Sequence, residues 1–485
     1  MPDRRRRRPR VDPPRRAAYD VLRAVRVDGA YTNLVLPHVL AERGLSGRDA
    51  GFVTELASGT LRRRGTYDAI LAACADRPLT KVDAKVLDCL RLGAHQLLAM
   101  RVPAHAAIST TVDLARDRAG HGAGGFVNAV LRRVSEHDLD AWLERVAPAA
   151  ADDPVGHAAV THSHPRWVVE ALAASLHPAH PAESAPVHPE SALVDAQSAP
   201  VHPESALVDP ELDALLAADN APPRVVLVAR PGRSTREELP GEPTPLSPYG
   251  VVLESGDPGA VPAVNEGRAG VQDEGSQLVA LAAVRAPVEG RDGRWLDLCA
   301  GPGGKAALLA GHAGERGAGL LANEAQPHRA GLVARNLRGA DGVTGVVAAD
   351  GTRPPWLPET FDRVLVDAPC TGLGALRRRP ESRWRRTPED LAGLVELQRA
   401  LLGSALDSTR PGGVVLYATC SPVLAETRGV VEAVLADRDD VLLEDAAPLL
   451  PEVSDAAGPL PGTLQLWPHR HRTDAMFMAL LRHTP

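Results

Sequence analysis

From about residue 286 to the C-terminus, short apolar segments rich in β-branched residues alternate with segments of helical periodicity. This alternation constrains the fold more than any other feature of the chain. It is typical of α/β folds, in which parallel strands are joined by helices that cover the sheet. The predicted strands are, in chain order, 295–298, 319–322, 346–347, 364–366 and 414–417. We therefore expect a Rossmann-like, doubly wound sheet whose ligand site lies at the carboxyl ends of its strands.

The rest of the chain has a different character. Apolar residues before residue 150 recur at spacings of three and four, which predicts a separate all-helical domain. The segment S-A-P-V-H-P-E-S-A-L-V-D occurs twice, at 184–195 and 198–209, and its proline content favours a linker. The predicted regions are a basic tail (1–12), the helical domain (13–150), a helical connector with the duplicated Pro/Ala/His-rich linker (151–221), a small α+β subdomain (222–285) and the α/β domain (286–485).

Composition narrows the class of protein. The 485 residues are 44% hydrophobic and 24% charged, as in ordinary globular proteins. No run of 18 apolar residues and no secretory signal is found, so we expect a cytoplasmic protein that is not bound to a membrane. Five cysteines in so long a chain indicate reduced thiols. The linker histidines are irregularly spaced between prolines, and we predict no metal site.

A glycine-rich loop, D-L-C-A-G-P-G-G-K at 297–305, follows the first predicted strand and opens a helix. Glycines let backbone amides approach a ligand, and a helix N-terminus favours an anionic group. The loop is neither G-x-G-x-x-G nor a Walker loop, so dinucleotide and ATP sites are disfavoured, and a plain tight turn is the alternative. Acids follow the next three strands at Glu324, Asp350 and Asp367. Singly each could be a helix cap, but together they favour a bound nucleoside cofactor.

Two cysteines occupy similar positions. Cys370, in V-D-A-P-C-T-G, and Cys420, in Y-A-T-C-S-P, each follow an apolar strand and open a loop. A single such cysteine would be interpreted as a small buried hydrophobe. The pair, so flanked, points instead to attack by a thiolate on a ring.

An arginine-rich segment begins seven residues after Cys370, although the net charge of the chain is −7. Its nearness to that cysteine favours contact with a nucleic acid, with the aromatic ring stacking on a base. A solvated arginine-rich loop is the alternative. The predicted RNA-binding residues are Arg377, Arg378, Arg379, Arg383, Trp384 and Arg385.

Taken together, these motifs resemble the bacterial 16S rRNA cytosine-5 methyltransferase B family (RsmB, also called Sun or Fmu). The N-terminal part, with D-G-A-Y-T-N at 28–33, G-T-L-R-R at 59–63 and F-V-N-A-V-L-R at 126–132, is similar to that family's NusB-like RNA-binding domain. The resemblance covers nearly the whole chain apart from the tail and the duplicated linker. It implies an enzyme that forms 5-methylcytosine during rRNA processing.

The resemblance also implies roles for individual residues. Cys420 would be the nucleophile that attacks carbon 6 of cytosine, Cys370 would assist product release, and Asp367 would contact the ring as well as the cofactor. The cofactor would be S-adenosyl-L-methionine, bound by Cys299, Ala300, Gly301, Pro302, Gly303, Gly304, Lys305, Glu324, Asp350 and Asp367.

The resemblance also indicates the substrate, and two alternatives remain open. The implied partner is 16S rRNA or an immature small ribosomal subunit, with no metal and no membrane, and we expect a monomer. One alternative makes Cys370 the nucleophile, because a Pro-Cys dipeptide serves DNA cytosine-5 enzymes in that way. Another is a non-catalytic RNA-binding or ribosome assembly factor in which the helical domain acts alone.

Overall fold

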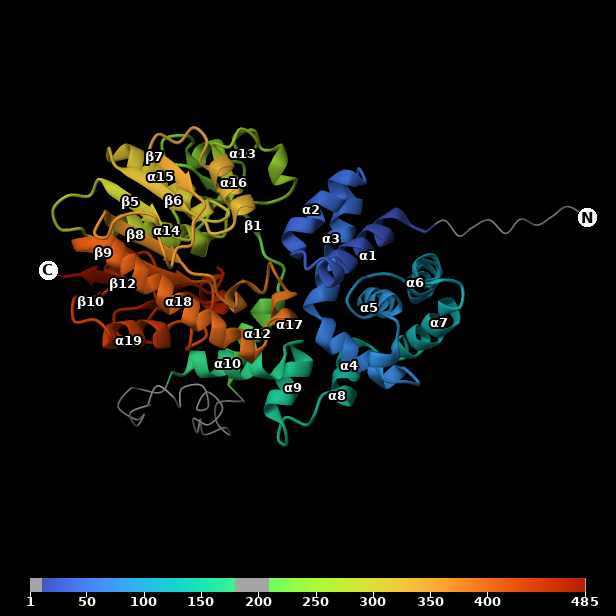
Figure 1. The fold of residues 1–485 in the computed structure, drawn as a ribbon. Coiled ribbons are helices and arrows are strands. Elements are labelled where there is room, and N and C mark those ends of the chain that lie inside the picture. Colours follow the sequence, from blue (N-terminus) through green and yellow to red (C-terminus); the bar gives the residue numbers. More distant parts are fainter. Residues whose placement is uncertain (1–10, 179–208, 485) are drawn as a thin grey trace, which may run out of the picture. The chain divides into compact units, whose positions relative to one another are not determined.

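The computed structural model describes residues 11–178 and 209–484 (Figure 1). Most of the predicted basic tail and the whole duplicated linker up to residue 208 lie outside these residues. The described chain divides into two compact units, which are treated separately. The helical unit contains residues 11–170, 209–222 and 376–385, and the sheet unit contains 171–178, 223–375 and 386–484.

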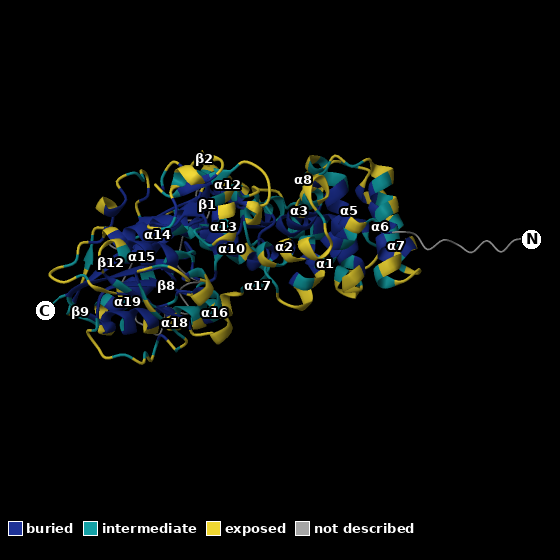
Figure 2. Ribbon diagram, turned by 90° about the horizontal axis from the view of Figure 1, so that it is seen from above, coloured by how far each residue is buried: buried dark blue, intermediate teal, exposed yellow. Residues whose placement is uncertain are grey.

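The helical unit confirms the predicted all-helical N-terminal fold. Its core is formed by apolar residues at helical spacing, such as Val21, Leu22 and Val25 on one face of the first helix. Figure 2 shows these helices with one buried and one exposed side. The helices are α1 (Pro13–Val27), α2 (Thr32–Glu42), α3 (Gly47–Arg62), α4 (Arg64–Cys74), α5 (Ala84–Leu98), α6 (Ala104–Ala119), α7 (Ala123–Val134), α8 (Leu139–Val146), α9 (Pro154–Thr161), α12 (Pro210–Asn220) and α17 (Ser382–Arg385), while α10 (Arg166–Leu176) has residues in both units.

The short segment 376–385 belongs to the helical unit although its neighbours in sequence belong to the sheet unit. A buried carboxylate fixes it there: Oε1 of Glu381 accepts a hydrogen bond from the backbone N–H of Thr32 at 2.9 Å, and Oε2 accepts one from the Thr32 hydroxyl at 2.6 Å. Because both carboxylate oxygens accept buried hydrogen bonds, and breaking them would leave a buried charge unpaired, the segment is held against α2.

The sheet unit begins with a small antiparallel sheet of order β2-β3-β1-β4. β1 (Val225–Ala229) pairs with β3 (Gly250–Leu253) and with β4 (Ala269–Val271), and β3 also pairs with β2 (Glu242–Pro243). The short helix α13 (Pro262–Asn265) precedes β4. This is the predicted α+β insert.

The main sheet has the order β10-β12-β9-β8-β5-β6-β7, with β11 paired to β12. The five strands β9, β8, β5, β6 and β7 run parallel, whereas β10, β11 and β12 are antiparallel to their neighbours. The expected Rossmann-like parallel sheet is therefore present, with an antiparallel edge. The strands are β5 (Arg294–Asp297), β6 (Gly319–Asn323), β7 (Val343–Val347), β8 (Phe361–Asp367), β9 (Thr409–Thr419), β10 (Val441–Glu444), β11 (Leu464–Gln465) and β12 (Phe477–His483).

Helices cover both faces of this sheet. One buried cluster joins it to α14 (Glu274–Arg285), α15 (Gly304–Glu315) and α16 (Pro327–Asn336). A second cluster joins its other face to α18 (Pro388–Ser408) and α19 (Arg428–Ala436). The short helix α20 (Pro468–His471) precedes β12. Two covered faces explain why the parallel strands are nearly continuous apolar runs.

The helix α18 begins with a capping box, in which the Thr387 hydroxyl accepts from the N–H of Asp390 and the Asp390 carboxylate accepts from the N–H of Thr387. The sequence suggests that Pro411-Gly412-Gly413 ends this helix. Instead α18 ends at Ser408, and those residues already lie in β9, where the pairing with β8 shifts register. No helix of the described residues is both long and apolar enough to cross a bilayer.

Candidate active site

The parallel strands end at one edge of the main sheet, and the predicted site residues follow them there. The glycine-rich loop follows β5, Glu324 follows β6, Asp367 ends β8, and Cys370 and Cys420 lie just beyond β8 and β9. The neighbouring order β9-β8-β5-β6 brings these loops together, although they are separated by more than a hundred residues in sequence.

The glycine-rich loop lies directly against Glu324. A Cβ atom added at Gly301 would lie 1.9 Å from Oε2 of Glu324, so a side chain at position 301 would require the end of the Glu324 side chain to shift. Glu324 is almost fully buried, and its Oε1 accepts a hydrogen bond from the N–H of Gln326 at 3.0 Å. Gly303 has φ +111°, a conformation that L-residues with a side chain rarely adopt, and α15 begins at the next residue.

Lys305, on the first turn of α15, links this loop to the neighbouring strand. Its Nζ donates to Oδ2 of Asp367 at 2.8 Å and lies 3.4 Å from Oγ of Ser276. Burial alone would lower the pKa of Lys305, but the negative charge and hydrogen bond of Asp367 outweigh it and raise this pKa. Lys305 is therefore a fixed cation at the centre of the site.

The sulfur atoms of Cys370 and Cys420 lie 3.4 Å apart. Both residues are partly buried and neither forms a disulfide. Hydrogen bonding to Cys420, then burial, raises the pKa of Cys370 well above its ordinary value, and the nearby carboxylates of Glu426 and Asp367 act in the same direction. The structure thus brings the sulfur atoms of the two cysteines into contact, in unequal electrostatic surroundings.

Two buried polar residues of this site do not appear among the predicted site residues. Asp297 ends β5, and burial, followed by the nearby Asp367 carboxylate, raises its pKa to about 8. Gln272 is 7% exposed, and neither polar atom of its amide has a hydrogen-bond partner among the described residues. A Cβ at Gly304 would lie 3.6 Å from Cδ of Gln272, so the amide faces the start of α15. Their only sequence signals are their places in D-L-C-A-G and V-Q-D-E-G-S-Q.

These features fit S-adenosylmethionine, the cofactor that the resemblance implies. The helix N-terminus offers backbone N–H groups to a carboxylate, and the unpartnered amide of Gln272 beside it can hydrogen-bond a polar ligand. Glu324 offers carboxylate oxygens at the place where ribose hydroxyls are bound in nucleotide-binding sheets. The donor set and the glycine loop are therefore suited to an amino acid joined to a nucleoside.

Asp350 occupies a more open position than the other acids. Its carboxylate accepts hydrogen bonds from the N–H and hydroxyl of Thr352 and pairs with Arg353 at 3.2 Å. These bonds lower the pKa of Asp350, the Thr352 hydroxyl being the largest cause. The carboxylate is thus ionised and half exposed beyond the end of β7.

The arginine-rich segment is mostly engaged within the helical unit. Arg383 is fully buried, and its guanidinium donates to the backbone oxygen of Ser163 at 3.1 Å, to Oδ1 of Asn220 at 2.8 Å and to the backbone oxygen of Asp219 at 3.2 Å. Burial lowers its pKa to about 10. Because Arg383 is fully buried and both of its terminal nitrogens already donate to protein oxygens, its role in this structure is structural, and RNA contact by Arg383 stays a prediction without support from its position.

Its neighbours are similarly placed. Arg385 donates to the backbone oxygens of Val25 and Ala30, and the ring of Trp384 packs so closely on Gly65 that a Cβ there would clash at 2.6 Å. Arg377 is 8% exposed. The segment therefore serves first as a structural part of the helical unit, and RNA contact by the half-buried Arg378 and Arg379 stays a prediction.

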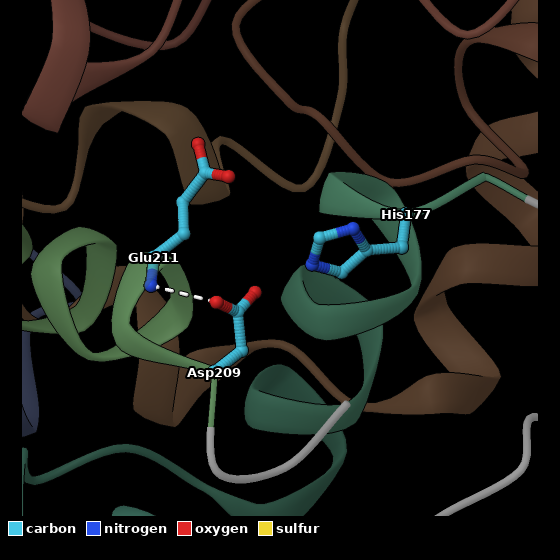
Figure 3. A group of neighbouring side chains, drawn as sticks. All are labelled: His177, Asp209 and Glu211. Carbon is cyan, nitrogen blue, oxygen red and sulfur yellow. Dashed lines mark hydrogen bonds between the residues drawn. The ribbon is translucent and has the colours of Figure 1, made fainter. Parts of the chain in front are cut away.

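The helix α12, which supplies two of the acceptors for Arg383, has its own cap. Asp209 is its N-cap residue, and the carboxylate accepts a hydrogen bond from the backbone N–H of Glu211 at 2.9 Å (Figure 3). This bond satisfies one of the free N–H groups at the start of the helix.

Family models match both units. The model described as 16S rRNA methyltransferase RsmB/F matches residues 283–482, and the NusB family model matches residues 12–136. The first match includes the glycine-rich loop, the acids and both cysteines of the pair.

Relatives match over nearly the whole length. The chain is 52% identical over 481 residues to a putative methyltransferase of Mycobacterium tuberculosis, covering 98% of each chain. It is 33% identical to the ribosomal RNA small subunit methyltransferase B of Pseudomonas syringae pv. tomato, covering 87% of this chain and 86% of that one. The crystal structure of PH0851 shares the fold, with a TM-score of 0.74 at 20% identity over 97% of this chain and 99% of that chain.

Proposed function

Since the chain belongs to the RsmB/F family of S-adenosylmethionine-dependent 16S rRNA methyltransferases, we propose that it methylates carbon 5 of a cytosine in 16S rRNA. The single observation that carries the cytosine-5 assignment is the pair of sulfur atoms, 3.4 Å apart, beside the glycine-rich loop. Methyl transfer to an oxygen or to an exocyclic nitrogen needs no thiol, whereas carbon 5 of a pyrimidine needs a nucleophile at carbon 6.

Cys420 acts as that nucleophile. Its thiolate adds to carbon 6, the electrons of the 5,6 double bond move toward ring nitrogen 3, and carbon 5 becomes able to attack a methyl group. As negative charge develops on nitrogen 3, a proton taken up from solvent is held between nitrogen 3 and the Asp367 carboxylate, and Lys305 fixes that carboxylate in place at 2.8 Å. The bound S-adenosylmethionine supplies the electrophilic methyl group.

Product release requires loss of the proton at carbon 5. When a base removes it, the electron pair re-forms the 5,6 double bond and the bond between carbon 6 and the Cys420 sulfur breaks. Cys370 assists this step, because its sulfur is in contact with the sulfur that must leave. The Cys370 thiol can also return a proton to the departing thiolate.

Cofactor binding falls to the residues along the strand ends. The backbone of residues 299–304 and the start of α15 receive the amino-acid part, and Glu324 receives the ribose. Asp350 would receive the adenine side of the nucleoside, and Asp367 with Lys305 would complete the cofactor site. The unpartnered amide of Gln272 adds a donor and an acceptor next to Gly304.

The RNA is the remaining partner. We assign it to the helical unit, because that unit matches the NusB family and carries exposed arginines on several helices. The substrate is 16S rRNA or an immature small ribosomal subunit. A target cytosine must leave its stack to reach the sulfurs, which costs a few kcal/mol and favours a loop or single strand.

The test separates the two cysteines. Cys420→Ser should abolish both methyl transfer and covalent capture of RNA, whereas Cys370→Ser should accumulate a protein–RNA adduct. The measurements are mapping of 5-methylcytosine in rRNA from cells with and without the protein, and denaturing gels of the variants with immature small subunits. The opposite pattern would make Cys370 the nucleophile. An unmodified rRNA pool in cells that contain the folded wild-type protein would instead favour a non-catalytic assembly factor.

A further inference from the structure

The residues that follow the two cysteines are joined beneath them. Thr371 follows Cys370 and Ser421 follows Cys420, and their hydroxyl oxygens lie 3.0 Å apart. Both hydroxyls are buried. The backbone on which each sulfur is carried is therefore tied to the other at the next residue.

A buried carboxylate closes this connection. Glu426 is 0% exposed; its Oε1 accepts the N–H of Thr371 at 2.7 Å and its Oε2 accepts the Thr371 hydroxyl at 2.5 Å. Gln398 extends the hold to the other side of Cys370, because its Nε2 donates to Oε1 of Glu426 at 3.0 Å and to the backbone oxygen of Pro369 at 2.8 Å. The residues on both sides of Cys370 thus depend on one carboxylate.

The charges around the two sulfurs are unequal. The groups near Cys370 are the Cys420 sulfur and the carboxylates of Glu426 and Asp367. Each of them disfavours a negative charge on the Cys370 sulfur. By contrast, the ammonium group of Lys305 interacts electrostatically with Cys420, and this positive charge favours a thiolate there. The buried Tyr417 and the partly buried Cys299 also lie near these groups, and each is neutral at ordinary pH because desolvation raises its pKa.

We propose that Glu426 is a positioning residue that gives the two cysteines different roles. Its carboxylate holds the Cys370 loop against Cys420. When the pair of thiols loses one proton to solvent, the same carboxylate favours the remaining proton on Cys370, so that the thiolate forms on Cys420, within electrostatic range of Lys305. This inference rests on the proposed function, because it explains why the nucleophile is Cys420 in a pair of touching thiols. A buried negative charge near one member of such a pair favours its neutral form.

The experiment compares the two sulfurs directly in the full-length protein without RNA or cofactor. Initial rates of iodoacetamide alkylation are measured for each cysteine peptide by mass spectrometry between pH 6 and pH 10. In the wild type, Cys420 should react at lower pH than Cys370, because only the thiolate is alkylated. A wild type in which Cys370 reacts at the lower pH would overturn the inference without any variant.

Glu426→Gln then removes the charge but keeps the shape. The amide oxygen can still accept from Thr371 N–H and Gln398, and the amide nitrogen can donate to the Thr371 hydroxyl, which turns toward Ser421. We expect Cys370 in this variant to be alkylated about tenfold faster at pH 8, because loss of the buried negative charge lowers its pKa. Glu426→Asp, which keeps the charge, should restore slow alkylation of Cys370.

A matched control shows whether any nearby acid has this effect. Glu432, on α19, is half exposed and pairs with Arg428, so Glu432→Gln removes one negative charge without touching the network. Its alkylation profiles should coincide with those of the wild type. If the Glu426→Gln profiles also coincide with the wild type, the inference fails. The proposed function fails separately, if Cys420→Ser still transfers methyl groups.

Discussion

Nζ of Lys305 lies 2.8 Å from Oδ2 of Asp367, which joins the first turn of α15 to the end of β8. Asp367 therefore has a cation in direct contact, whereas Asp297, on the adjacent strand β5, is fully buried and lies near the same carboxylate. Asp367, at the end of β8, is thus paired with a cation, whereas burial opposes ionisation of Asp297, at the end of β5. This difference leads to a prediction about pH.

Asp297 should make the sheet unit less stable as the pH rises. Its pKa is about 8 in the folded protein and 3.8 in a model peptide, so between these values the folded state binds more protons than the unfolded state. Stability is then full below about pH 4 and falls until about pH 8. Asp297→Asn removes this term, and the melting temperature of the variant should rise relative to the wild type across that window. Parallel melting curves from pH 5 to pH 9 would refute the prediction.

Gln272→Leu should separate stability from cofactor binding. The buried amide has no partner among the described residues, so replacing it with an apolar group should leave the melting temperature of the cofactor-free protein equal or higher. The affinity for S-adenosylmethionine, measured by calorimetry, should fall by about 1–3 kcal/mol. The control is Gln277→Leu, since the amide of Gln277 is bonded to Ser247 and to the backbone of Gln272. The Gln277→Leu variant should have a lower melting temperature than the wild type.

Gly301→Ala should weaken cofactor binding. The added methyl group would lie 1.9 Å from the Glu324 carboxylate and 2.8 Å from Nη2 of Arg329, so Glu324 must move. We expect at least a tenfold higher dissociation constant for S-adenosylhomocysteine, about 1.4 kcal/mol. Gly331→Ala is the control, because no atom of the described residues outside α16 and its chain neighbours lies within 4 Å of its Cβ position in this helix. It should raise stability by about 0.5–1 kcal/mol with unchanged affinity.

Arg383→Met should destabilise the helical unit rather than weaken its hold on RNA. The change leaves the acceptors on Ser163, Asp219 and Asn220 unpaired in a buried place, at a cost of about 3 kcal/mol in the free energy of unfolding. Arg23→Met, at an exposed position in the same unit, should change stability by less than about 0.5 kcal/mol. RNA affinity of the folded variant should keep the salt dependence of the wild type, and a smaller slope would return Arg383 to the RNA interface.

The sequence alone was enough to predict the fold of both units and the residues at the strand ends. Periodicity distinguishes helices from strands locally, and parallel strands necessarily bring their carboxyl ends to one edge. This is why Lys305, Asp367, Cys370 and Cys420 could be expected in one place before any coordinates were known.

Only the tertiary structure decided how these groups are partnered. Glu426 gave no signal as an isolated acid, and it matters because folding buries it against Thr371 and Gln398. Arg383 looked like a surface cation, yet it is buried and donates to Ser163, between α9 and α10, and to Asn220, at the end of α12. Burial and hydrogen bonding set the charge state and accessibility of a side chain. Both depend on which remote segments of the chain meet in the fold, so a local sequence pattern cannot predict them.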